Sequence, residues 1–257
     1  MDHRRLRICQ DRHRYLEALT APKEKRELIG AVDKPRSTVD RDVRLLDEAG
    51  AVERDAGRYR LTAFGRLVLE SVSTTFEVFT AICRAEAVVD AMPTTAMVPP
   101  ELFVDATVIA AEEHAPAEVI RETSDRVHEA TAVDALVPVV HPLHVDRFCA
   151  VLEDGAEVDR FDLVFTSAVV SELIRSYETP FRTLITDDTT RLFEVRSLPY
   201  GLFHLERSGE SEVVVLAYES GSPAGAIVSS TEFAIEWAEE TVDRFRSKGT
   251  ELRGSES

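Results

Sequence analysis

Six arginines lie in one short stretch of this 257-residue chain, between Pro35 and Gly65. Guanidinium groups donate paired hydrogen bonds to phosphates and to guanine edges, so the cluster has the chemistry of nucleic-acid recognition. The chain as a whole has a formal net charge of −17, which makes such a cluster unexpected. Residues 1–66 carry 16 Lys and Arg against 12 Asp and Glu, whereas the other residues carry 14 against 35. A cationic head therefore precedes a strongly acidic body.

The acidic body offers little catalytic chemistry. His141 and His144 could ligate a metal, but no carboxylate–histidine pair at helical spacing accompanies them, and a polar strand–helix junction is the simpler interpretation. Ser171 and Ser176 lack a GxSxG nucleophile motif, and ESGSPAG (219–225) is typical of a hairpin turn rather than a phosphate loop. The sequence predicts no catalytic residue, no metal site and no cofactor. A hydrolase fused to a binding head is the weakest interpretation.

Length and composition favour two folded domains in the cytoplasm. The chain is 44% apolar, which is enough for real cores. It has no apolar run of 18 residues and no apolar signal core at its start, so we expect no membrane segment and a cytoplasmic protein. Four lysines against 26 arginines, with the acidic excess, resemble proteins of salt-loving archaea. An acidic protein from a GC-rich bacterium is the alternative.

The head has the periodicity of a helical domain. Residues 11–20 and 23–32 are predicted helices, and a third is expected to run from Ser37, as its N-cap, to about Ala49. At 100° per residue, Val39, Val43 and Leu46 share one face of this third helix. Ser37, Arg41 and Arg44 lie opposite, as a helix that enters a DNA groove requires.

After Gly50 the period changes from helix to strand. AVERD and GRYRLT alternate around a tight Ala56-Gly57 connection, and Thr62 is expected to cap a further helix. This order is that of a winged helix-turn-helix domain. The segment LLDEAGAVERDAGRYRLTAFG resembles the corresponding part of archaeal and bacterial winged-helix regulators, and the resemblance covers residues 11–70.

The third helix and the wing predict double-stranded DNA as a partner. An α-helix fits the major groove, and its N-terminal residues meet base edges. We expect base contacts from Ser37, Thr38 and Arg41, and phosphate contacts from Arg36, Arg44, Arg54, Arg58 and Arg60. Acidic neighbours (Asp40, Asp42, Asp47 and Asp55) dilute this surface. The alternative is a ligand-binding or protein-interaction module whose winged helix does not contact DNA.

Residues 63–92 are predicted to form one long connecting helix. Its apolar residues recur every three or four positions, and winged-helix regulators usually bind two half-sites as dimers, so the stripe predicts a homodimer seam. Packing within one chain is the alternative. The stripe comprises Leu67, Val68, Val72, Phe76, Phe79, Ile82 and Cys83. The predicted domains are the winged helix-turn-helix at 1–66, the connecting helix and linker at 67–95, and the effector domain at 96–257.

The body alternates strand and helix patterns, which predicts an α/β domain and, with the head, an α+β chain. Parallel pairing is expected early and antiparallel pairing late. LPYGLFHLE (198–206) and EWAEETVDRFRSKG (236–249) resemble the effector domain of a family of archaeal regulators, first described from a regulator of methanogen filament formation. The resemblance covers most of residues 100–248 and implies an archaeal transcription factor with a sensory domain. The body is also loosely similar to the phospholipase-D-like sensor domain of archaeal sugar-responsive regulators, but no His-x-Lys pair supports that chemistry.

The expected effector site lies beyond the carboxyl ends of the strands, where helix N-termini present free N–H groups. Small hydroxyls, an aromatic hydroxyl and an arginine there would suit a small anionic metabolite. The alternative is that the serines only cap helices and Tyr200 only packs. The candidate residues are His141, Thr166, Ser167, Arg175, Tyr200, Ser229 and Ser230.

Overall fold

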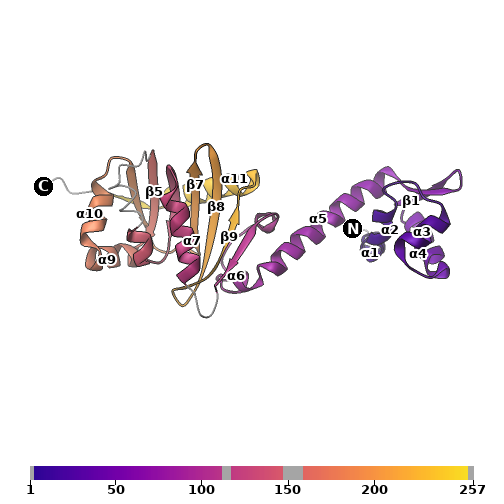
Figure 1. Cartoon of the computed structure of the whole chain (residues 1–257), viewed down its shortest axis with the longest axis horizontal. Coiled ribbons are helices and arrows are strands. Elements are labelled where there is room, and N and C mark those ends of the chain that lie inside the picture. The colour runs from indigo at the N-terminus through magenta and orange to yellow at the C-terminus, as the bar shows by residue number, and fades with distance from the viewer. Residues whose placement is uncertain (1–2, 112–116, 147–158, 254–257) are drawn as a thin grey trace. The chain divides into compact units, whose positions relative to one another are not determined.

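The computed structural model describes residues 3–111, 117–146 and 159–253 and divides into two compact units, residues 1–79 and 80–257 (Figure 1). In the first unit, short helices precede a β-hairpin and the start of a long helix. Their bounds are α1 His3–Asp11, α2 His13–Ala18, α3 Lys25–Val32, α4 Arg36–Glu48, β1 Val52–Asp55, β2 Arg58–Leu61 and α5 Ala63–Arg84. No helix in these ranges is long and apolar enough to cross a membrane.

Helix α4 packs into the head through the predicted face. Val39, Val43 and Leu46 are buried in one core cluster with residues of α2 and α3. The helix begins two residues earlier than a cap at Ser37 implies, at Arg36, and Ser37 is not its N-cap. Pro35 takes that position in an extended conformation, and its carbonyl accepts hydrogen bonds from the N–H groups of Thr38 and Val39. The prediction of Ser37 as the cap is therefore wrong.

The hairpin forms a two-residue turn, as predicted. Asp55 pairs with Arg58, so only Ala56 and Gly57 lie between the strands, with φ of 47° and 86°. Two positive φ values are typical of a type I′ turn, whose twist matches the flanking strands. The sequence therefore located the tip of the wing.

Helix α5 is fastened to the base of the hairpin at its first turn. The Thr62 hydroxyl donates to the Gly50 carbonyl at 2.7 Å and accepts from the Gly65 N–H at 2.9 Å, which confirms Thr62 as the cap. A Cβ at Gly65 would lie 1.9 Å from the Ala51 carbonyl oxygen. Only glycine allows this approach.

The single connecting helix predicted to run to residue 92 is interrupted. Helix α5 ends at Arg84, and a short helix α6 spans Glu86–Asp90. Between them Ala85 is buried, with φ of −95° and ψ of 12°. The break lets Val88 pack against Gly225 so closely that a Cβ at Gly225 would lie 2.6 Å from it. Packing in the body overrides the helical propensity of this segment.

The second unit is built on an eight-stranded sheet of the order β10-β6-β5-β4-β7-β8-β9-β3. Strands β4, β5 and β6 pair in parallel, and the remaining pairs are antiparallel. The predicted order of early parallel and late antiparallel pairing is confirmed from β4 onward, whereas the first strand, β3, pairs antiparallel with β9. The strands are β3 Thr107–Ala110, β4 Ala132–Val137, β5 Arg160–Thr166, β6 Thr190–Val195, β7 Gly201–Arg207, β8 Glu210–Glu219, β9 Ser222–Ser229 and β10 Thr250–Leu252. The mixed sheet confirms the α/β prediction for the body.

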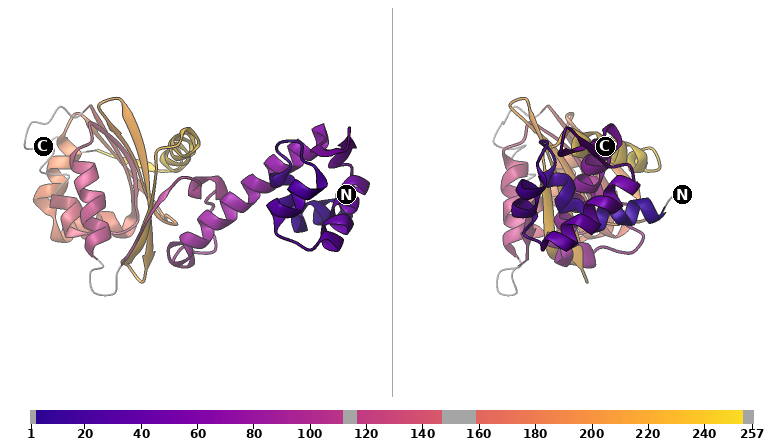
Figure 2. Two further views of the ribbon diagram at one scale, coloured as in Figure 1. Left: turned by 45° about the vertical axis from the view of Figure 1, so that its right-hand side comes forward. Right: turned by 90° about the vertical axis from the view of Figure 1, so that its right-hand side faces the viewer.

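Helices cover both faces of this sheet (Figure 2). Helices α7 (Ala117–His128), α9 (Ser167–Ser176) and α10 (Glu178–Thr186) pack on one face, and α11 (Glu232–Arg246) packs with α6 on the other. Side chains of a strand alternate between the faces, so Val133 and Leu163 join the first core and Leu136 and Val164 the second. Helix α10 and strand β10 were not predicted from the sequence.

Candidate nucleic-acid interface

Helix α4 presents its predicted polar face to solvent. Ser37, Arg41 and Arg44 are exposed, opposite the buried Val39 and Val43. The Arg41 Nε lies 3.6 Å from a carboxylate oxygen of Asp42, and its side chain is 64% exposed. Ion pairs this long and this exposed are weak, so these guanidinium groups can exchange their partners for a phosphate or a base.

The remaining arginines differ in how strongly they are paired. Arg60 lies 2.8 Å from a carboxylate oxygen of Glu53, and Arg58 lies 3.6 Å from one of Glu24. The Arg54 guanidinium covers the Tyr59 ring at 5.6 Å from its centroid. Arg36 is exposed, with no ion pair to any residue in the described part of the chain. Arg60 is therefore the least available of the predicted phosphate contacts.

Backbone and ionic contacts join the wing to the start of α3 and to α4. Lys23 and Tyr59 exchange two backbone hydrogen bonds, of 2.8 and 3.0 Å. Arg58 then pairs with Glu24, and Lys25 pairs with Asp40 on α4. The structure thus links the wing residues and the N-terminal half of α4 within one unit.

A hollow of about 680 Å³ borders the N-terminal half of α4. Thr38 and Arg41 line it on the helix, and Lys34 and Arg14 add cations from neighbouring segments. Thr38 is half-buried, whereas Ser37 is exposed. Lys34 and Arg14 were not predicted as site residues. Both lie outside the helix whose periodicity selected Arg41. Only their position in the cationic head could have indicated them.

Asp42 faces the core, contrary to its expected place among the acids on the cationic surface. It is 8% exposed and accepts hydrogen bonds from Arg12 Nε at 3.0 Å and from the Tyr15 hydroxyl at 3.1 Å. Burial and the bond to Asp42 raise the pKa of Tyr15 to about 12. Asp42 lies beside Leu46 on the helical wheel, so its position on an apolar face was visible in the sequence. It joins α2 to α4, and it is also the carboxylate that lies 3.6 Å from the exposed Arg41.

The predicted effector residues occupy two opposite edges of the body sheet. His141 follows β4, and Thr166 and Ser167 end β5 and begin α9, so all three lie at the carboxyl edge of the parallel strands. Tyr200 precedes β7, which is antiparallel to β4, and lies at the same edge. Ser229 ends β9 and pairs with Val213, toward the other edge, where Ser230 lines a separate hollow of about 580 Å³. The structure does not bring the two serines together with the rest.

Several of these side chains already have structural roles. Thr166 accepts the Val169 N–H as the N-cap of α9, and the Tyr200 ring is fully buried, 6.1 Å from the Trp237 ring. Arg175 pairs with Glu172 one turn earlier on α9. Ser167 is exposed, and His141 is half-buried. Capping and packing, the alternative interpretation, therefore account for Thr166 and Tyr200.

His144, next to His141, is a buried histidine. Its ring packs edge-on against Phe203, with centroids 5.5 Å apart, and neither ring nitrogen has a hydrogen-bond partner among the residues described. Burial, with a smaller contribution from the charge of His141, lowers the pKa of His144 to about 4. The imidazole is neutral at neutral pH.

The body also holds a buried charge network that the sequence did not predict. The Asp162 side chain on β5 is fully buried and pairs with Arg191 on β6 and Arg246 on α11. One strand away, Asp134 on β4 pairs with Arg160 at 2.7 Å. The pair with Arg246 joins α11 to the sheet, and the pair with Arg191 joins β5 to β6.

A winged helix-turn-helix with a cationic outer face, joined in one chain to a separate α/β unit, defines a DNA-binding regulator. Residues 116–248 match the family described as "Methanogenesis regulatory protein FilR1, middle domain". That match spans just over half of the chain, so this protein belongs to the FilR1 middle-domain family. Residues 2–84 match the HVO_A0261 N-terminal domain. No curated protein matches the chain.

Two solved structures resemble the chain weakly. TrmBL2, an archaeal chromatin protein, is 13% identical with a TM-score of 0.44, and the match covers 98% of this chain and all of that one. Nuc from Salmonella typhimurium, a phospholipase D family member, is 14% identical with a TM-score of 0.42 over 58% of this chain and 98% of that one. Similarities this low leave the function to the site itself.

Proposed function

We propose that this regulator recognises a specific DNA sequence through the N-terminal half of α4, while the wing arginines contact the backbone. The observation that carries the proposal is the division of α4 into a buried apolar face and an exposed face with Ser37, Arg41 and Arg44. A helix that served only for packing would not need two exposed arginines on one side. In a groove, Arg41 would meet a base edge, and Arg58 would meet a phosphate.

Binding titrations with two arginine variants test this assignment. Fragments that the wild-type protein enriches from genomic DNA serve as the specific probe, and a scrambled duplex serves as the nonspecific one. Arg41→Ala should weaken specific binding by about 1–3 kcal/mol and relax the sequence preference, because a base contact is lost. Arg58→Ala should weaken binding to the specific and the nonspecific probe equally, since phosphate contacts carry no sequence information.

The salt concentration must be fixed, because phosphate contacts depend on it steeply. Arg121→Ala on α7 is the matched control, since this arginine is as exposed as Arg58 and belongs to the body. It should leave both affinities unchanged. If Arg41→Ala and Arg58→Ala bind like the wild type, α4 and the wing are not the DNA-contacting elements and the protein-interaction interpretation gains support.

The proposed regulator acts as a homodimer through α5. Leu67, Phe76 and Phe79 on this helix are exposed, Phe79 by 63%. Val72 is buried and Ile82 packs into the core of the body, so part of the predicted stripe serves the chain itself. Phe79→Asp should shift the mass measured by light scattering from dimer to monomer, because a charge would enter the seam. A wild-type protein that is already monomeric excludes the dimer.

The body is proposed to act as a sensor and not as an enzyme, which agrees with its membership of a regulatory family. A small anionic metabolite would bind at the carboxyl edge of β4 and β5, where Ser167 is exposed and His141 is half-buried. A thermal-shift screen of organic acids and phosphorylated sugars tests this site. Stabilising compounds whose effect survives both Ser167→Ala and His141→Ala bind elsewhere.

A further inference from the structure

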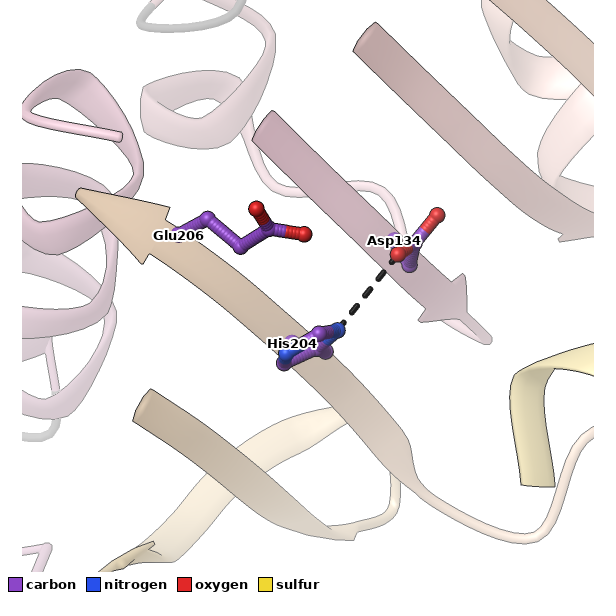
Figure 3. A group of neighbouring side chains, drawn as sticks. All are labelled: Asp134, His204 and Glu206. Atoms are coloured by element: carbon purple, nitrogen blue, oxygen red, sulfur yellow. Dashed lines mark ion pairs between the residues drawn. The ribbon is translucent and has the colours of Figure 1, made fainter. Parts of the chain in front are cut away.

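Three side chains that can ligate a metal lie close together on the body sheet (Figure 3). By strand alternation they share the face of Leu136 and Leu202, which pack with α11. Asp134 comes from β4, and His204 and Glu206 come from β7. One ligand atom from each lies within 4.8 Å of the other two. Asp134 pairs with His204 in the ladder, and Glu206 is two residues along β7, so strand alternation places all three on one face.

His204 is the unusual member of this group. Its side chain is 2% exposed, and neither ring nitrogen has a hydrogen-bond partner within the described ranges. Its Nδ1 lies 3.4 Å from Oδ2 of Asp134, and the ring is aimed at the carboxylate (Figure 3). Oδ1 of Asp134 is also buried and unpaired. Buried polar atoms nearly always have a partner, so two such groups facing each other indicate a ligand site.

Arg160 occupies the solvent side of the same group. Its Nη2 lies 2.7 Å from Oδ2 of Asp134 and 3.3 Å from Oε1 of Glu206. One guanidinium therefore supplies a single positive charge to two carboxylates. Its side chain is 41% exposed, which leaves it room to turn outward. Asp162, the next carboxylate along the sheet, is already paired with Arg191 and Arg246 and is not available.

We infer that Asp134, His204 and Glu206 bind one first-row divalent cation of the zinc or manganese type, in competition with Arg160. A divalent ion balances both carboxylates, whereas the guanidinium balances one. An imidazole together with carboxylates favours zinc or manganese over the oxygen-seeking magnesium and calcium. This inference assigns the body a metal ion as a ligand. It is independent of the proposed DNA-binding function.

Equilibrium dialysis of the full-length, tag-free, chelator-treated protein against Zn²⁺ and Mn²⁺ tests the site, with bound metal measured by mass spectrometry. The wild type should bind one equivalent. His204→Gln should weaken binding by more than about 100-fold, because loss of a ligand exceeds the effect of its outer partners. Arg160→Gln should strengthen binding, because the competing cation is removed. Arg207→Gln, which removes a surface pair with Glu129 at the end of β7, should change nothing.

The gain of affinity in Arg160→Gln separates this site from adventitious binding to an acidic surface, which loss of one arginine would barely change. A wild type that binds neither metal overturns the inference, as does binding that is equal in wild type, His204→Gln and Arg160→Gln. Equal binding of Mg²⁺ or Ca²⁺ overturns the assigned class of ion. If His204→Gln does not fold, unchanged affinity in both Arg160→Gln and the half-exposed Glu206→Gln overturns it.

Discussion

The head and the body use arginine in opposite ways. In the head, Arg41 and Arg44 are 64% and 70% exposed, and their nearest carboxylates lie 3.6 and 3.9 Å away. In the body, Arg191 and Arg246 converge on Asp162, whose side chain is fully buried. The difference teaches that the availability of a cation depends on its pairing and not on the net charge of the region. The buried Asp162 holds Arg191 and Arg246 of the body in place, whereas Arg41 and Arg44 of the head are only weakly paired and remain available to a partner.

The strongest test of this comparison is the removal of the buried carboxylate of the body. Asp162→Ala removes two charge-assisted contacts, although Arg246 keeps Asp243 as a partner, and should lower the free energy of unfolding by about 3–5 kcal/mol. Trp237 on α11 is the only tryptophan of the chain, so denaturation followed by its fluorescence reports on this unit.

Glu178→Ala is the matched control, because the Glu178–Arg182 pair is almost fully exposed and should contribute less than about 1 kcal/mol. Equal effects of the two substitutions would show that burial does not set the strength of pairing in the body.

The pH dependence of the stability of the body tests a second buried group, the neutral His144. Its pKa of about 4 lies below the ordinary value of about 6.5, so the unfolded chain binds the extra proton first. Stability is therefore full above pH 6.5 and falls as the pH drops toward 4, by about 3 kcal/mol over the whole range. His144→Leu should flatten this part of the curve, measured by Trp237 fluorescence. An unchanged pH dependence in the variant would mean that other groups cause the loss.

Asp42 gives the head a buried, paired carboxylate of the kind that Asp162 gives the body. Asp42→Ala leaves Arg12 and the Tyr15 hydroxyl without their buried partner, and should destabilise the head by about 2–3 kcal/mol. Circular dichroism at 222 nm should show an earlier transition, while Trp237 fluorescence stays as in the wild type. The exposed Asp47→Ala is the control and should have little effect. A shift of both probes would mean that the two units unfold together.

Local patterns predicted much of the head. The spacing of Val39, Val43 and Leu46 located the buried face of α4, and Ala56-Gly57 located the hairpin turn. The N-cap at Ser37 failed because Pro35 already terminates the preceding loop and supplies the first carbonyl of the helix. Helical periodicity could also have placed Asp42 on the buried face, since a polar residue within an apolar stripe is itself a signal.

In the body the sequence indicated most strands and helices but not which strands lie next to each other. The alternation of strands and helices predicted parallel pairing early and antiparallel pairing late, which holds for β4 with β5 and for β7 with β8 but not for β3. It could not show that Asp134 and His204, 70 positions apart, face each other across β4 and β7. Strand order is a long-range property, and the expected meeting of Ser229 with Thr166 failed for the same reason.

The contact of Gly65 with the Ala51 carbonyl has a mechanical consequence. The backbones approach too closely for any side chain, and Thr62 bonds to both Gly50 and Ala51. The end of α4, the root of the wing and the first turn of α5 are thereby clamped at one joint. A rotation of the first turn of α5 would therefore be passed directly to the base of the hairpin.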